Sequence, residues 1–65
     1  MHPTTQRFIQ VLTEDIKWWE QAAHHVEVLL PNIAEPDRGR WRETANAYRR
    51  RADEFKALIE DLKKE

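Results

Sequence analysis

Four large apolar residues recur at every seventh position in the second half of the chain: Trp41, Tyr48, Phe55 and Leu62. Seven residues are close to two turns of an α-helix, so these side chains lie in one row along a helix. One neighbouring row holds Ala45, Ala52 and Ile59, the other holds Thr44, Arg51 and Leu58, and the opposite face is almost entirely charged or amide. No segment alternates strictly between apolar and polar residues, as a half-buried strand would. The pattern predicts an amphipathic helix over about residues 37–63.

The first half of the chain has a second helical pattern. Apolar residues recur at intervals of three and four from Phe8 to Leu30. Pro31 lacks a backbone donor and disfavours helical backbone at the residue before it, so the helix should end near Leu30. The hydroxyl groups of Thr4 and Thr5, directly after a proline, are candidate caps at its start. These signals predict a first helix over about residues 4–30.

Residues 31–36 form the connector between the two predicted helices. Asn32 with Glu35 three positions later is the spacing of a capping box, which predicts a single turn inside the connector. Pro36 followed by an acidic residue suits the start of the second helix. Gly39 weakens the first turn of that helix by about 1 kcal/mol relative to alanine. The predicted fold is therefore all-α, an antiparallel two-helix hairpin that occupies residues 1–65 as one domain.

Loop length predicts how the two helices align. In an antiparallel hairpin that turns at residues 31–36, facing positions have numbers that add up to about 67, which pairs Trp19 with Tyr48. The same alignment places Val26 opposite Trp41, Phe8 opposite Leu58, and Asp15 opposite Arg51. Leu29 shares the row of Phe8 and Asp15, and Asp15 and Arg51 are each the single charged residue in the central rows, those that face the other helix. We therefore expect a buried ion pair that fixes the register. The alternative is that both side chains lie at the edge of the contact and reach water.

The first helix is apolar over a wider arc than one helix contact requires. Val11, Trp18 and His25 recur at seven-residue intervals beside the main stripe, with Val28 nearby. Trp18 and its neighbour Trp19 point about 100° apart and cannot both lie centrally in one contact. We expect this arc to bind another surface, either a second copy in a dimeric four-helix bundle or a larger protein target. The alternative is that Trp18 covers its own hairpin and stays partly exposed.

Arginines are the most conspicuous charged feature of the second helix. Arg38, Arg42 and Arg49 are expected near a common outer face with Arg50 to one side of it, and these four are candidate phosphate contacts. Against this reading, three acidic residues are interleaved at helical spacing: Glu43, Asp53 and Glu54. The formal net charge of −1 also lacks the strongly basic character of a dedicated nucleic-acid-binding protein. Binding of RNA or DNA is therefore the second hypothesis for function.

The composition leaves little support for catalysis. The chain has no cysteine or serine and one glycine, so it offers no thiolate nucleophile, cysteine-ligated metal or glycine-rich phosphate loop. Glu20, His24 and Glu27 could share an outer helix face, but metal sites in bundles project inward, so we expect no metal or other cofactor. No stretch is apolar enough to cross a bilayer and no signal peptide is evident, which predicts a cytoplasmic protein without membrane contact.

In size and layout, the predicted hairpin resembles the plasmid repressor-of-primer type of helical hairpin. The resemblance covers the architecture alone and transfers no functional residue to this chain. It implies pairing of two hairpins into a four-helix bundle, and it implies RNA binding as an activity. From the residues themselves, we expect a small non-catalytic regulator or protein–protein interaction module.

Overall fold

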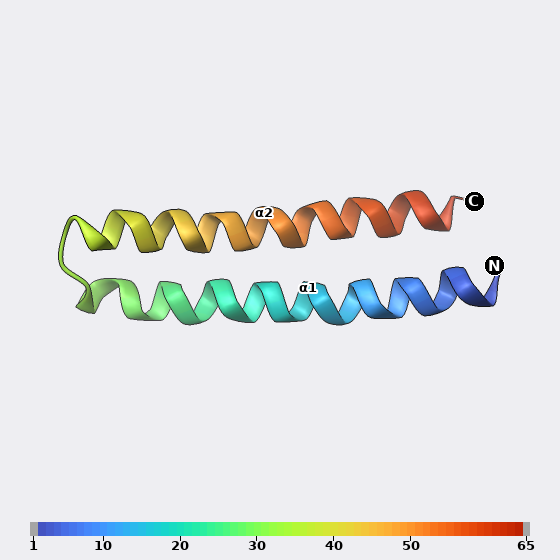
Figure 1. Cartoon of the computed structure of the whole chain (residues 1–65), viewed down its shortest axis with the longest axis horizontal. Coiled ribbons are helices and arrows are strands. Elements are labelled where there is room, and N and C mark those ends of the chain that lie inside the picture. Colours follow the sequence, from blue (N-terminus) through green and yellow to red (C-terminus); the bar gives the residue numbers. More distant parts are fainter. Residues whose placement is uncertain (1, 65) are drawn as a thin grey trace.

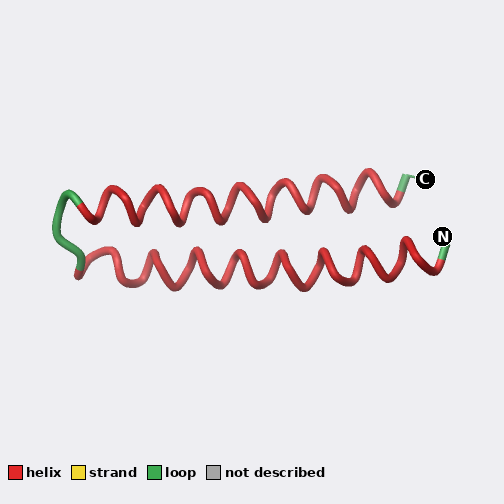
Figure 2. Tube along the Cα trace, in the orientation of Figure 1, coloured by secondary structure: helices red, strands yellow, loops and turns green. Residues whose placement is uncertain are grey.

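In a computed structural model of the chain, residues 2–64 are described, and they form two long helices joined by a short connector (Figure 1). Helix α1 spans Pro3–Leu29, a 3₁₀ turn η1 spans Leu30–Asn32, and helix α2 spans Asp37–Lys63. The helices lie antiparallel, so both ends of the chain are at the same end of the molecule. Within residues 2–64 there is no strand, and non-helical backbone is confined to the connector and the chain ends (Figure 2). The all-helical prediction is confirmed, and each helix begins and ends within one residue of its predicted range.

The molecule is a rod. It measures 49 × 15 × 11 Å, and its radius of gyration is 15.1 Å. A compact chain of 65 residues would have a radius of gyration of about 11 Å. The accessible surface is 5133 Å², against about 4,400 Å² for a compact monomer of 7.9 kDa. The isolated hairpin therefore exposes about 700 Å² more surface than a typical monomer of its mass.

The core is one narrow line of apolar side chains between the helices, which we call the seam. Alanines at three of its positions let the two backbones approach closely. No large side chain among residues 2–64 is fully buried, because each seam residue is covered from one neighbouring helix only. The buried residues of the seam are Leu12, Ile16, Ala23, Val26, Ala45, Ala52 and Ile59, with Ile9, Trp19, Phe55 and Leu62 half-buried beside them.

The start of α1 is capped by a residue that the sequence pattern did not indicate. The Nδ1 atom of His2 accepts a hydrogen bond of 3.1 Å from the backbone N–H of Thr4, and Pro3 takes the first helical position. The predicted hydroxyl cap at Thr4 or Thr5 is therefore wrong. Pro3 fits this position because the backbone N–H that proline lacks has no partner in a first helical turn.

Hydrogen bonds from Arg38, and not a capping box, join the connector to α2. The Nε atom of Arg38 donates to the carbonyl oxygen of Ile33 at 2.8 Å, and the backbone N–H of Arg38 donates to the carbonyl oxygen of Ala34 at 3.1 Å. The single turn of the connector begins at Leu30, earlier than predicted, and it has no side-chain cap. The predicted capping box of Asn32 and Glu35 is therefore absent.

The contact between the helices follows part of the predicted alignment. The ring centroids of Trp19 and Tyr48 lie 5.3 Å apart, as expected from the loop length. The predicted buried ion pair of Asp15 and Arg51 is wrong, because both residues are exposed and Arg51 contacts Glu54 of its own helix at 3.4 Å. Their rows lie at the edge of the seam, where each charge remains in water and avoids the desolvation cost of burial.

Replacing Gly39 with alanine should stabilise the hairpin by about 0.5–1 kcal/mol, because glycine is a poor helix former. Gly39 lies in the first turn of α2 with a negative φ, and an added Cβ would meet only the Oε2 atom of Glu35, at an ordinary contact distance of 3.6 Å. A higher midpoint of urea unfolding for Gly39→Ala would confirm this. A lower midpoint would mean that the turn needs glycine there.

Candidate protein-interaction face

A row of mostly apolar residues along α1 lies beside the seam and is largely exposed. We call this row the open stripe, and its members follow one another at alternating intervals of three and four residues. Phe8, Val11, Trp18 and Leu29 are 47%, 49%, 58% and 44% exposed. Each member from Phe8 to His25 directly precedes a seam residue, so the open stripe is rotated by about 100° from the seam on the same helix. The members of the open stripe are Phe8, Val11, Asp15, Trp18, Ala22, His25 and Leu29.

The residues of the first helix are therefore divided between the seam and the open stripe differently from the prediction. Phe8 and Leu29 were expected in the contact with α2, and they are exposed members of the open stripe instead. Of the four predicted interface residues, Val11, Trp18 and His25 belong to the open stripe, and all four are exposed. Val28 lies at a further 100° around the helix from Leu29, so it flanks the stripe and does not belong to it. The three-and-four spacing of the row could have identified Phe8 and Leu29.

Trp18 is the largest exposed side chain of the open stripe, and the hairpin holds it from one side. Its ring lies edge-on to Trp19, with centroids 4.7 Å apart, and 6.4 Å from the ring of Tyr48. More than half of its surface remains in water. Trp18 therefore partly covers its own hairpin, as the alternative proposed, and still presents an apolar face that is fixed in position by aromatic contacts.

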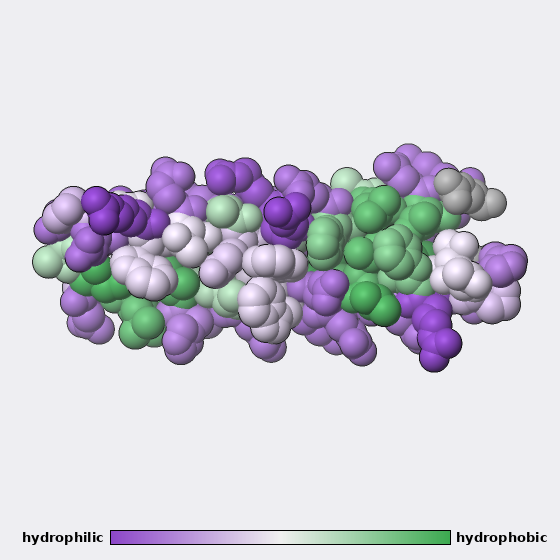
Figure 3. All heavy atoms as spheres, in the orientation of Figure 1, coloured by the Kyte–Doolittle hydropathy of each residue, from purple (hydrophilic) through white to green (hydrophobic). Residues whose placement is uncertain are grey.

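The space-filling view shows where apolar surface gathers on the face of the molecule seen in Figure 1. Green surface lies toward the end with the two termini, and a second green area lies near the connector (Figure 3). Near the connector, His25, Val26, Leu29, Ile33 and Trp41 line an apolar groove of about 480 Å³. Trp41 is 47% exposed there, although its row predicted burial against Val26. The groove could accept an apolar side chain from outside the hairpin.

The other side of the seam is polar and is bridged by two ion pairs between the helices. Lys56 contacts Glu20 at 3.1 Å, and the guanidinium of Arg49 donates two hydrogen bonds to Glu27, at 3.0 and 2.6 Å. Each of these glutamates directly follows a seam residue, whereas the members of the open stripe from Phe8 to His25 directly precede one. The ion pairs and the open stripe therefore lie on opposite sides of the seam. The hairpin has one apolar side and one charged side.

The ion pair of Glu27 and Arg49 changes the proton affinity of both groups. The hydrogen bonds from Arg49 lower the pKa of the Glu27 carboxyl below its usual value, and the nearby positive charge of Arg49 acts in the same direction. The same hydrogen bonds raise the pKa of the Arg49 guanidinium. Both side chains are open to solvent, so salt screens their attraction.

Glu27→Gln should lower the melting temperature at neutral pH, and the difference from the unchanged chain should shrink in acid. A carboxyl with a lowered folded-state pKa stabilises the fold above its unfolded pKa of about 4.3, and this contribution is lost as pH falls through the folded-state pKa. Thermal unfolding at both pH values measures the difference. Glu43→Gln is the matched control, because Glu43 is exposed and makes no ion pair among residues 2–64. An equal effect of both substitutions at neutral pH would contradict the prediction.

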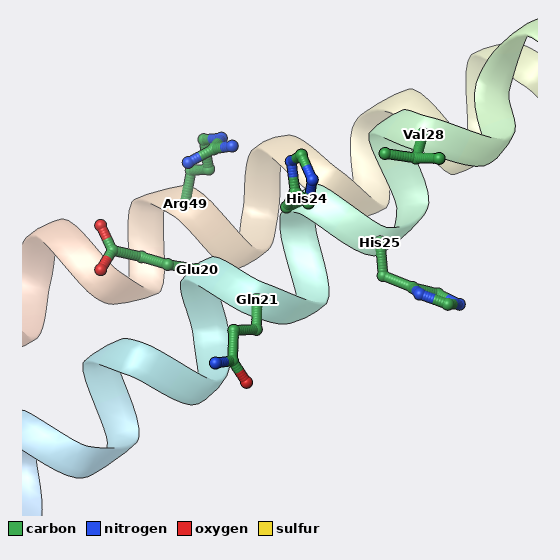
Figure 4. A pocket seen from close by; sticks show the side chains of 6 residues that line it. All are labelled: Glu20, Gln21, His24, His25, Val28 and Arg49. Atoms are coloured by element: carbon green, nitrogen blue, oxygen red, sulfur yellow. The ribbon is translucent and has the colours of Figure 1, made fainter.

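A shallow depression on the outer side of α1 contains the residues considered for metal binding. Figure 4 shows His24 and His25 pointing in different directions, with Arg49 of α2 beside Glu20. Glu20 and Glu27 are engaged by cations of α2, and no three histidine or acidic side chains of residues 2–64 are placed to hold one metal ion. The depression is open to solvent and is lined by five polar residues and Val28.

Two of the four candidate phosphate-binding arginines of α2 are engaged by hydrogen bonds within the hairpin. Of the four candidate phosphate contacts, Arg38 is bonded to the connector and Arg49 to Glu27. Arg42 and Arg50 are exposed and make no ion pair within residues 2–64. Two guanidinium groups eight residues apart are a weak basis for phosphate binding, because both engaged arginines would have to give up internal hydrogen bonds.

The chain matches no protein-family model, and it has no significant match among curated proteins or solved structures. Neither helix, within residues 2–64, combines the length and apolar character needed to cross a membrane.

Proposed function

We propose that this chain is a small non-catalytic protein–protein interaction module that acts as a dimer of helical hairpins. The observation that carries the proposal is the open stripe, a line of mostly apolar residues along α1 whose four large apolar side chains are each 44–58% exposed. Isolated exposed apolar residues are common on monomers, but a row at heptad spacing is the pattern of a helix that packs against a second helix.

The surface area of the hairpin supports self-association. The excess of about 700 Å² over a compact monomer is close to the roughly 800 Å² that each partner buries in a typical stable interface. A four-helix bundle would also cover the half-buried aromatic residues Trp19, Tyr48 and Phe55 from a second side. The open stripe lies about 100° from the seam, which suits a helix that has two neighbours at the corner of such a bundle.

Co-expression of two copies with different affinity tags tests the proposal. We expect capture of one copy to retain the other, and we expect the purified copies to exchange partners when mixed. A charged substitution in the open stripe, Val11→Glu, should abolish retention, whereas Lys17→Glu at an exposed position outside the stripe should leave it intact. Equal retention of the two variants would refute the open stripe as the interface, and no retention of the unchanged chain would refute the dimer.

Binding of RNA or DNA is the competing function, and Arg42 and Arg50 are the arginines best placed for it. Phosphate contacts predict an affinity that falls steeply as salt concentration rises. A titration of short RNA and DNA duplexes and single strands at low and moderate salt separates the two functions. Salt-sensitive binding that is lost in Arg42→Gln and Arg50→Gln would favour nucleic acid as the partner.

A further inference from the structure

The open stripe has a spacing that matches itself when it is reversed. From Val11 to Leu29 its members are separated by intervals of four, three, four, three and four residues, which read the same in both directions. Two copies of α1 that run antiparallel about a twofold axis near residue 20 therefore bring every one of these positions opposite another member of the stripe. Antiparallel helices in coiled-coil contacts interdigitate with this same spacing.

We infer that the open stripe binds the open stripe of a second copy, antiparallel, with facing residues whose numbers add up to 40. This inference rests on the proposed dimer and specifies its geometry. The alignment places Asp15 opposite His25 of the second copy, Trp18 opposite Ala22, and Val11 opposite Leu29. Twofold symmetry makes each of these contacts twice.

Charge and size complementarity select this register. Asp15 is the one carboxylate of the open stripe, and here it meets the imidazole of His25, which can donate a hydrogen bond. The indole of Trp18 meets the small side chain of Ala22, which leaves room for it. In two other registers, the numbers of facing residues add up to 33 or about 36. These registers place Asp15 against Trp18 or Ala22 of the other copy, without a polar partner.

The groove near the connector gives independent support. The antiparallel register places Val11 and Phe8 of the second copy opposite Leu29 and the first residues of the connector. This is the part of the chain where Leu29, Ile33 and Trp41 line the apolar groove of about 480 Å³. Phe8 and Val11 are two of the most exposed apolar residues at the other end of α1. The exposed side chains of Phe8 and Val11 and the apolar groove thus lie at about equal distances along α1 from the proposed twofold axis, on opposite sides of it.

Disulfide trapping tests the register, because the chain has no cysteine and every trapped bond reports an engineered pair. His25→Cys is mixed under reducing conditions with one of three variants, Asp15→Cys, Val11→Cys or Phe8→Cys, and then oxidised. The inference predicts that His25→Cys forms a disulfide predominantly with Asp15→Cys, identified by its mass. Neither variant should pair with itself, because identical positions lie ten residues, or about 15 Å, apart along the axis.

The mass of each reduced mixture, measured by sedimentation, separates a wrong register from the absence of a dimer. Predominant trapping with Val11→Cys or Phe8→Cys, or no trapping in mixtures that sediment as dimers, would overturn the register and leave the dimer standing. If loss of Asp15 or His25 prevents association, Val11→Cys mixed with Leu29→Cys tests the same register with both polar residues in place. If the unchanged chain sediments as a monomer, the proposed dimer itself is refuted.

Discussion

Trp18→Ala should weaken self-association by on the order of 1,000-fold while the hairpin remains helical. Truncation of a tryptophan at the centre of an interface commonly costs about 2 kcal/mol or more, and a twofold dimer loses two of them. Within the hairpin, Trp18 contacts Trp19 and Tyr48 from the exposed side of the seam, so its loss removes little of the core. Sedimentation over a range of concentrations measures the association, and far-ultraviolet circular dichroism measures the helix content.

Two controls make the Trp18 result specific. Lys17→Ala changes the adjacent exposed residue on a different face of α1, and it should leave association unchanged. Trp18→Phe keeps an aromatic ring, and it should weaken association less than alanine does. If Trp18→Ala associates as tightly as the unchanged chain, Trp18 does not belong to the interface. If its helix content collapses, the side chain has a larger role in the hairpin than its exposure indicates.

Ala52→Asp should unfold the hairpin at room temperature. Ala52 is 1% exposed and packs in the seam with Leu12, Ile16 and Ile59. A carboxylate at this position has no partner, and its desolvation costs several kcal/mol. The net stability of a small domain is only about 5 kcal/mol, so this cost is enough to shift the equilibrium to the unfolded chain.

Ala57→Asp is the matched control for Ala52→Asp, because it makes the same substitution in the same helix at an exposed position. The lower helix propensity of aspartate should cost about 0.5 kcal/mol there, which leaves the fold intact. Circular dichroism at 222 nm compares the two variants. Equal helix content in both would mean that the seam does not bury Ala52.

The helix ranges were predictable because the two prolines of the connector and the apolar periodicity act locally. Pro31 and Pro36 limit the helices on either side of the connector, whatever the helices later contact. The seam was harder to predict, because three adjacent rows of α1 carry apolar residues and periodicity cannot decide which two of them face α2. The structure assigns the row of Phe8, Asp15 and Leu29 to the open stripe. This one change explains why the ion pair with Arg51 does not form.

The remaining differences depend on side-chain geometry that sequence spacing does not contain. Histidine is not among the common N-cap residues, so the sequence pattern does not indicate His2 as the cap of α1, although the residue before Pro3 is where a cap would lie. The ion pairs of Glu20 with Lys56 and of Glu27 with Arg49 join long side chains from positions outside the central rows. A search limited to those rows could not find them, and these pairs identify the polar side of the hairpin.

The mass of the unmodified chain in solution tests the central claim most directly, because a single hairpin leaves the open stripe in water and a pair of hairpins covers it. Sedimentation equilibrium at micromolar concentrations and above should give a mass twice that of the 7.9 kDa chain, with dissociation only on dilution. A mass of 7.9 kDa that persists at the highest concentrations would contradict the claim.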